Sequence, residues 1–346
     1  MISTTNDRWR ASTRCPTGTR EGDDKKTMTH NIRYGVNVPT SGGDSEHTSL
    51  PFCDHIDWQD QRAFGKAAEA LGYDSLGVPD HIMTGSGPTT ECLTTVTGLA
   101  GVTDDVTLYP KTINNHLRHG PLLAKTVATL DVVSGGRVKL GMGAGWKADE
   151  ATAYGYEWPA APTRLREMKE TIRLMKRLWT ENEVTHDGEF YELESAICKP
   201  HPVQDPHPPI MIGGGGEQIT LRMAAEYADT WNYYGSLEKM KRKLGVLREH
   251  CETADRPFDA IEKSWFARCI VRETEAEVQA LLEEAPRFTG DRAGSGGAAL
   301  VGTPAEVCEQ LRAYRDLGFE EVIVEFVDFP ETTGLELFAD EVMPRL

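Results

Sequence analysis

The chain has 346 residues, with 37 Lys and Arg against 54 Asp and Glu, and its formal net charge is −17. Hydrophobic residues make up 39% of the sequence, which is enough for a large folded core. This acidic composition argues against binding to nucleic acid or to an anionic membrane surface, because both depend on clustered basic residues. So acidic a chain is compatible equally with an ordinary acidic soluble protein and with a protein of a high-salt cytoplasm.

The seven cysteines form no CxxC pair, and their number is odd. This usage is typical of reduced, buried thiols and predicts a cytoplasmic protein. No apolar run reaches the roughly 18 residues that a membrane-spanning helix needs. Residues 1–27 lack an apolar signal core and are rich in Thr, Arg, Asp and Gly. We expect them to be a disordered extension, followed by a single domain over residues 28–346.

From residue 31 onward, short apolar runs alternate with longer helical patterns, which predicts βαβ units and a parallel sheet. The expected strands are 32–38, 75–78, 106–112, 137–141, 209–213, 228–232, 265–271 and 321–326. The expected helices are 58–71, 121–133, 164–179, 218–227, 237–251 and 304–317. Eight strands predict an α/β fold, a (β/α)8 TIM barrel with insertions. A doubly wound open sheet is the alternative, but its GxGxxG fingerprint is missing near the start.

Two segments interrupt this alternation. The motif HDGEFYEL within residues 184–208 predicts a short hairpin, followed by a proline-rich connector. Residues 287–298 contain GDRAGSGGA, which predicts a mobile loop of the length typical of active-site lids, or equally a disordered segment.

In a (β/α)8 barrel the active site lies at the carboxyl ends of the strands. Small residues, amides and aromatic residues dominate these positions, which suits a flat aromatic cofactor better than a metal cluster. No HExxH motif is present, and we predict no metal site. The candidate residues outside the glycine-rich run at 213–216 are Asn37, Asp80, His81, Lys111, Thr112, Asn114, Gly143, Ala144, Gly145, Trp146 and Trp231.

The run IMIGGGGEQITLRMAAEYAD places Gly213, Gly214, Gly215 and Gly216 between a strand and a helix. Glycines allow a ligand to approach the backbone closely, and amides at a helix N-terminus bind phosphate. A tight turn without a ligand is the alternative, although a turn needs fewer glycines. No GK[ST] follows, so this is not a P-loop for nucleoside triphosphates.

Asp80 and His81 follow the second predicted strand. A histidine can donate or accept a proton near neutral pH, and the neighbouring aspartate can orient it or cap the next helix. A purely structural role is equally compatible with the pair.

Four segments, in order, resemble the bacterial luciferase-like family of flavin or deazaflavin oxidoreductases. The first two are FGKAAEALGYDSLGVPDHI and LYPKTINNHLRHGPLLAKTVATLDVVSGGRVKLGMGAGW. The third comprises DGEFYEL and KPHPVQDPHPPIMIGGGGEQITLRMAAEYADTWN, and the fourth is VGTPAEVCEQLRAYRDLGFEEVIV. The resemblance covers almost the whole chain after residue 31.

This resemblance implies a barrel with FMN or the deazaflavin coenzyme F420 across the strand ends. It places the cofactor phosphate at Gly213–Gly216 and further cofactor contacts at Gly143, Ala144, Gly145 and Asn114. It also implies a backbone bulge at Lys111 and Thr112, often a non-proline cis peptide, although relatives usually have Gly or Ser in place of Lys111. Asp80 and His81 would then belong to the pocket for cofactor and substrate.

The leading hypothesis is an oxidoreductase that transfers a hydride between F420 and a small organic substrate. In it, His81 handles the proton together with Asp80, while Asn37, Trp146 and Trp231 form the substrate pocket. The alternative is an FMN-dependent monooxygenase that uses oxygen together with reduced flavin. A separate reductase would supply the reduced flavin. A third hypothesis is a non-catalytic flavin-binding protein. The resemblance further implies a homodimer.

Overall fold

The computed structural model describes residues 32–44, 49–50, 52–288 and 299–346. Residues Asn31–Leu346 belong to one compact unit. The expected extension over residues 1–27 lies outside the described residues, as does most of the glycine-rich segment 287–298.

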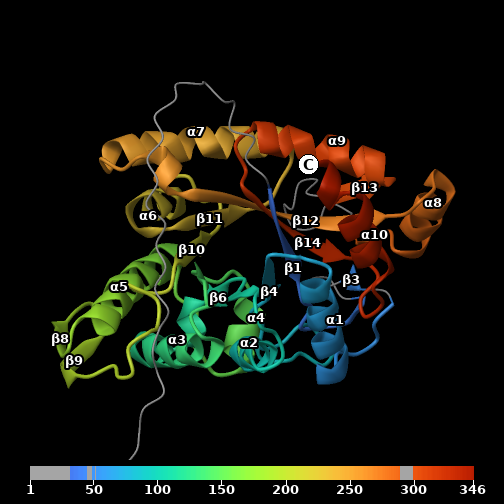
Figure 1. Cartoon of the computed structure of the whole chain (residues 1–346). Coiled ribbons are helices and arrows are strands. Elements are labelled where there is room, and N and C mark those ends of the chain that lie inside the picture. The colour runs from blue at the N-terminus through green and yellow to red at the C-terminus, as the bar shows by residue number, and fades with distance from the viewer. Residues whose placement is uncertain (1–31, 45–48, 51, 289–298) are drawn as a thin grey trace, which may run out of the picture. The chain divides into compact units, whose positions relative to one another are not determined.

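Eight parallel strands form a barrel in the middle of this unit (Figure 1). A bridge between Leu108 and Val138 joins the two ends of the sheet and closes the ring between β5 and β7. In order around the barrel, the strands are β1 (Arg33–Asn37), β4 (Ser75–Val78), β5 (Thr107–Pro110), β7 (Leu140–Gly143), β10 (Ile210–Gly213), β11 (Thr230–Tyr233), β12 (Glu262–Val271) and β14 (Glu321–Phe326). The eight predicted strands and the TIM barrel are confirmed, with shifted ends for several strands.

The third strand of the barrel is interrupted. After β5 ends at Pro110, Lys111 and Thr112 leave the strand, and the short β6 (Ile113–Asn114) then pairs in parallel with β7. The peptide bond between Lys111 and Thr112 is cis, as the family resemblance implies. This bulge places two neighbouring side chains at the open end of the barrel.

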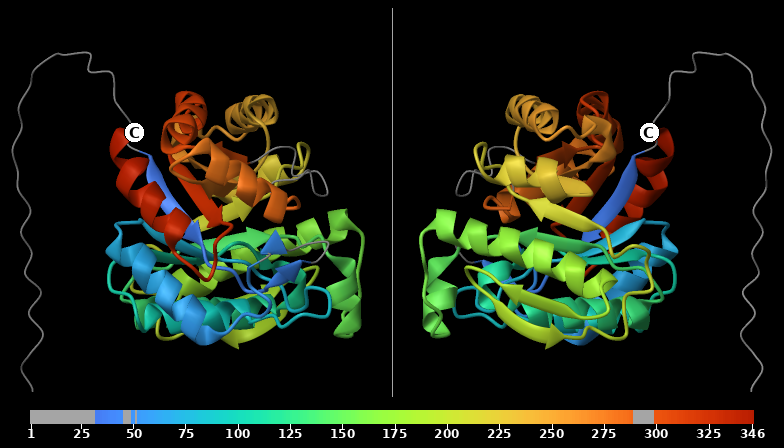
Figure 2. Two further views of the ribbon diagram at one scale, coloured as in Figure 1. Left: turned by 90° about the vertical axis from the view of Figure 1, so that its right-hand side faces the viewer. Right: turned by 90° about the vertical axis from the view of Figure 1, so that its left-hand side faces the viewer.

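Helices pack around the outside of the strands, as the side views show (Figure 2). The sequence predicted α1 (Trp58–Ala70), α3 (Gly120–Ser134), α5 (Ala161–Thr180), α6 (Thr220–Tyr227), α7 (Leu237–Thr253) and α9 (Pro304–Asp316). It did not predict α2 (Cys92–Ala100), α4 (Ala148–Ala153), α8 (Glu275–Glu284) and α10 (Thr333–Glu341). None of the helices in the described part of the chain is both long and apolar enough to cross a membrane.

Three smaller strand pairings complete the fold. The predicted hairpin is present as β8 (Val184–Asp187) and β9 (Glu192–Ala196), which pair antiparallel. A second antiparallel pair is β2 (Gly43–Asp44) with β3 (Ser49–Leu50). The strand β13 (Ala299–Gly302), which the sequence did not predict, pairs in parallel with the end of β12.

The interior of the barrel is filled in layers, as is usual for this fold. Tyr109, Met211 and Ile323 form a buried apolar layer, with Phe266 packed against it. Below this layer, Lys139 forms an ion pair with Glu321, at 3.3 Å between Nζ and Oε2. The apolar layer therefore separates the buried ion pair from the open end of the barrel.

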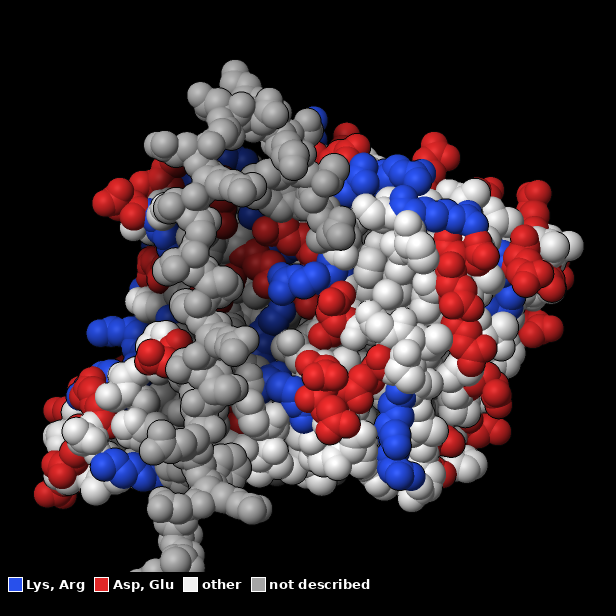
Figure 3. All heavy atoms as spheres, in the orientation of Figure 1, with Lys and Arg blue, Asp and Glu red and all other residues white. Residues whose placement is uncertain are grey.

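The surface carries the acidity of the chain. Asp and Glu side chains are spread over the visible face and are interspersed with Lys and Arg (Figure 3). Six of the seven cysteines belong to the described residues, and all six are buried and unpaired.

Candidate active site

A cavity of about 530 Å³ opens at the carboxyl ends of the strands. This is the end of a (β/α)8 barrel where active sites lie. Most of the candidate residues from the sequence line it: Asp80, His81, Lys111, Thr112, Asn114, Gly143, Ala144, Gly145, Trp146, Gly213, Gly214 and Gly216. The fold therefore brings together candidate residues from four separate strand ends into one site.

Three candidate residues lie behind the cavity wall rather than on it. Trp231 is fully buried, and its Nε1 donates a hydrogen bond of 2.9 Å to the carbonyl of Gly214. Asn37 is 1% exposed, and its amide Nδ2 donates to Glu325 Oε2 at 2.6 Å. Gly215 packs against the ring of Tyr233. Because strand residues alternate in direction, a position at a strand end does not by itself decide which side chains reach the cavity.

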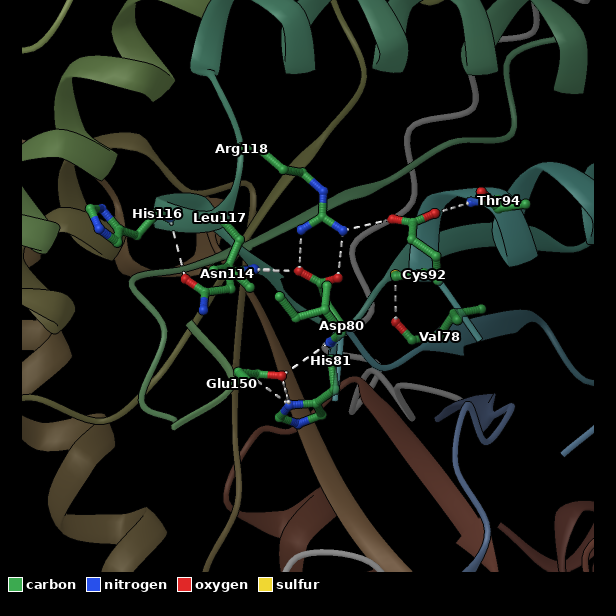
Figure 4. A network of polar contacts seen from close by, with 12 residues as sticks. Val78, Asp80, His81, Cys92, Thr94, Asn114, His116, Leu117, Arg118 and Glu150 are labelled. Carbon is green, nitrogen blue, oxygen red and sulfur yellow. Dashed lines mark hydrogen bonds and ion pairs between the residues drawn. The ribbon is translucent and has the colours of Figure 1, made fainter. Parts of the chain in front are cut away.

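The carboxylate of Asp80 is enclosed by hydrogen-bond donors (Figure 4). Arg118 binds it with both terminal nitrogens, at 2.5 Å to Oδ2 and 2.7 Å to Oδ1. The backbone N–H of Asn114 donates to Oδ2 at 2.7 Å. The Asp80 side chain is fully buried, and Arg118 also reaches Glu91 at 2.7 Å. Asp80 thus ties the end of β4 to the end of β6, and we assign it a positioning role.

The imidazole of His81 pairs with Glu150 of α4 (Figure 4). The distance from His81 Nδ1 to Glu150 Oε1 is 3.1 Å, and the backbone N–H of Ile82 donates to Glu150 Oε2 at 3.0 Å. A carboxylate only accepts hydrogen bonds, so His81 Nδ1 carries a proton here. None of the described residues forms a hydrogen bond with His81 Nε2, which leaves this nitrogen available to a ligand in the cavity.

Glycines form a cradle at the ends of β7 and β10. A Cβ atom added at Gly213 would lie 2.7 Å from Thr112 Cγ2, and one added at Gly143 would lie 2.7 Å from Thr112 Oγ1. The φ angle of Gly214 is 126°, a conformation that other residues rarely adopt. The cradle thus has room only for backbone. The N–H of Gly214 donates to the carbonyl of Asn232 at 3.1 Å, so the amides that suit a phosphate group are those that follow it before the helix α6.

Arg164 of α5 holds the segment that follows β7, and the sequence did not single it out. Its Nε donates to the carbonyl of Ala144 at 3.0 Å, and Nη2 donates to the carbonyl of Gly145 at 3.2 Å. Trp146 comes next and lies edge-on to His81, with 5.8 Å between ring centroids. Arg164 therefore positions the wall of the cavity beside His81.

Lys111 extends from the bulge of the third strand towards β12. Its Nζ lies 3.4 Å from the ring centroid of Phe266. Burial lowers the pKa of Lys111 from 10.5 to about 8; the negative charge of Glu325 opposes this shift and the positive charge of Arg268 adds to it. The cavity thus contains an ammonium group that the protein stabilises poorly.

This environment predicts that Lys111→Met stabilises the protein. Because the pKa of Lys111 is lower in the folded chain than in the unfolded chain, its charge costs stability in full below about pH 8. The cost shrinks as the pH rises from about 8 towards 10.5. We expect a gain on the order of 2 kcal/mol in the free energy of unfolding at pH 7, measured by urea denaturation. A variant less stable than wild type at pH 7 would contradict this prediction.

The comparisons with known proteins agree with this geometry. The family profile described as luciferase-like monooxygenase matches residues 32–291. The chain therefore belongs to the luciferase-like monooxygenase family. Its relatives in this family are oxidoreductases, and this chain is an oxidoreductase as well.

Two curated relatives differ in their cofactors. An F420-dependent glucose-6-phosphate dehydrogenase of Microbacterium testaceum is 30% identical over 317 residues, which are 82% of this chain and 92% of the relative. An FMNH(2)-dependent dimethylsulfone monooxygenase of Pseudomonas putida is 28% identical over 258 residues, which are 64% of this chain and 69% of the relative.

A solved structure supports the fold. It is an F420-dependent secondary alcohol dehydrogenase in complex with an F420-acetone adduct. The TM-score is 0.75 at 18% identity, and the match covers 90% of this chain and 98% of the other.

Proposed function

We propose that the protein transfers a hydride between coenzyme F420 and a small organic substrate. The observation that carries this proposal is the combination, in one cavity, of a glycine cradle suited to a phosphate with a histidine whose outer nitrogen forms no hydrogen bond to any residue that the structure describes. The longer match to the F420-dependent relative supports F420 over FMN.

In this proposal, different residues of the cavity bind the cofactor phosphate and support its ring system. The cradle at Gly143 and Gly213 gives the cofactor phosphate room beside Thr112, and the amides that follow Gly214 before α6 bind it. The bulge at Lys111 and Thr112 supports the flat ring system. When bound, such a cofactor supplies a ring carbon that accepts or releases a hydride. The protein must then move one proton for each hydride that the substrate loses or gains.

His81 is the candidate for that proton. Glu150 holds Nδ1 in its protonated form and orients the ring, so that Nε2 of the neutral ring can accept a proton from a substrate hydroxyl. In the opposite direction the protonated ring donates to a substrate carbonyl oxygen. Trp146 lies at the edge of the same ring and narrows the access of water from one side.

Binding and turnover test the proposal together. The purified chain is titrated separately with F420 and with FMN by isothermal calorimetry. Turnover is then followed through the absorbance of oxidised F420 with glucose 6-phosphate and with secondary alcohols. We expect F420 to bind more tightly than FMN and to be reduced by a substrate of one of these classes. Tight binding of FMN without binding of F420 would overturn the proposal.

The match to the dimethylsulfone monooxygenase supports an FMN-dependent monooxygenase as the second candidate. In that case a separate reductase would supply reduced flavin, and oxygen consumption would depend on it. The homodimer and any reductase partner stay predictions.

The glycine cradle yields a direct prediction. Gly213→Ala places a methyl group 2.7 Å from Thr112 Cγ2, so the cradle must shift. Overpacking costs about 1–3 kcal/mol where it occurs in a folded core. If restoring the cradle for the cofactor costs the same amount, the affinity for the cofactor falls roughly 5–150-fold. The matched control is Gly245→Ala in α7, where an added Cβ meets no atom within 4 Å. Equal losses of affinity in both variants would contradict the assignment.

A further inference from the structure

We propose that Lys111 binds a negatively charged oxygen of the substrate, so that the cavity prefers organic acids to neutral molecules of the same shape. This inference rests on the proposed function, because it assigns the substrate class of the same cavity. It concerns a residue that the bulge brings into the site and that the proton transfer through His81 does not use.

The first argument is the direction of the side chains at the bulge. Thr112 faces the cradle, since Cβ atoms added at Gly143 and Gly213 would both collide with it. Lys111 reaches to the other side, where its Nζ lies over Phe266 of β12. The phosphate cradle at β7 and β10 and the ammonium group at β12 therefore serve different parts of the cavity.

The second argument is the lack of an acceptor for the ammonium group. Among the described residues the ammonium group of Lys111 forms no hydrogen bond or ion pair, and the face of the Phe266 ring beside it cannot satisfy three N–H donors. Glu325 is the carboxylate whose negative charge acts on Lys111, but both of its oxygens accept hydrogen bonds from other residues. Arg268 Nε donates to Oε1 at 3.1 Å, and Asn37 Nδ2 donates to Oε2 at 2.6 Å.

The third argument is the charge balance at this end of the cavity. Arg268 and Glu325 compensate each other as an ion pair, so within the described part of the chain the positive charge of Lys111 has no ion-pair partner. A buried charge without a partner is costly, and a ligand that supplies the opposite charge removes that cost. In a chain of net charge −17, a cationic group at this place is a specific feature of the site.

These arguments favour the substrate over the cofactor as the source of the anion. The cradle already offers backbone amides to the cofactor phosphate, and it lies on the side to which Thr112 points. An anionic oxygen at Lys111 would place the rest of a substrate between Phe266 and the other cavity walls. A carboxylate and a phosphate ester share the required chemistry.

The test compares pairs of probes that differ in charge. Calorimetric titrations of the full chain use 3-hydroxybutyrate against 3-hydroxybutyramide, and glucose 6-phosphate against glucose, with and without saturating F420. Wild type is expected to bind at least one anion about 10-fold more tightly than its neutral partner, as a charge-assisted hydrogen bond allows. Lys111→Met is expected to lose this preference. The control Lys169→Met, at a surface ion pair with Glu226, is expected to keep it.

Three results would overturn the inference. The first is that no anion binds wild type about 10-fold more tightly than its neutral partner. The second is that Lys111→Met keeps the preference. The third is a 10-fold loss of F420 or FMN affinity in Lys111→Met, which would assign the ammonium group to the cofactor. Failure of the proposed function looks different: wild type would bind neither cofactor, while the titrations without cofactor would still report on Lys111.

Discussion

His81→Ala is expected to lower kcat by about 10²–10⁴-fold, while the affinity for the cofactor changes little. The imidazole lies at the cavity wall with Nδ1 held by Glu150, whereas the phosphate cradle is built from β7 and β10. Removing the ring therefore removes the group that exchanges a proton with the substrate, but leaves the cofactor contacts intact. Steady-state kinetics on the substrate that supports turnover, together with cofactor titration, separate the two effects.

The matched control is His55→Ala, because His55 is exposed and does not line the cavity. Its kcat should equal that of wild type. Glu150→Gln keeps the shape of the side chain but also offers an N–H donor to His81 Nδ1. We expect its rate to lie between wild type and the roughly 10⁴-fold loss that follows amide replacement of a carboxylate orienting a catalytic histidine. An unchanged kcat in His81→Ala would exclude His81 from the proton transfer.

The barrel was predictable because its strands are buried on both faces and read as continuous apolar runs. The residues Ser75–Val78 and Leu140–Gly143 are buried throughout, for example. The helix α2 escaped prediction because its sequence, CLTTVTGLA, is rich in Thr and contains Gly, which are weak helix formers. Its helical state comes instead from burial of residues such as Val96 and Leu99 in the core.

The site was predictable only in part. Glycine runs and strand-end residues are local signals, and they identified the cradle and His81. The partners of these residues come from distant segments: Glu150 is 69 positions from His81, and Arg118 is 38 positions from Asp80. In a chain with 54 acidic residues, no local pattern distinguishes Glu150 from the others. Such pairs become visible only when the fold brings them together.

The ion pair between Asp80 and Arg118 gives the largest expected effect on stability. Asp80→Ala leaves the guanidinium, 14% exposed, without its bidentate partner, and it also frees the backbone N–H of Asn114. Breaking a buried pair by removing one member costs about 3–5 kcal/mol. We expect a loss of this size in the free energy of unfolding, measured by urea denaturation. The exposed pair of Arg166 and Glu189 is the control, and Glu189→Ala should leave stability unchanged within error.

A double variant distinguishes the ion pair from simple loss of packing. In Asp80→Ala the guanidinium of Arg118 keeps only its contact with Glu91, at 2.7 Å, whereas replacing Asp80 with Ala and Arg118 with Leu removes both charges of the buried pair. If the pair is the cause, the double variant is more stable than Asp80→Ala alone. If both variants lose the same stability, the cost comes from the backbone of Asn114 and the packing around it. In either case the backbone of Asn114 loses its acceptor, so cofactor affinity should fall together with stability, because Asp80 connects the ends of β4 and β6 at the cavity.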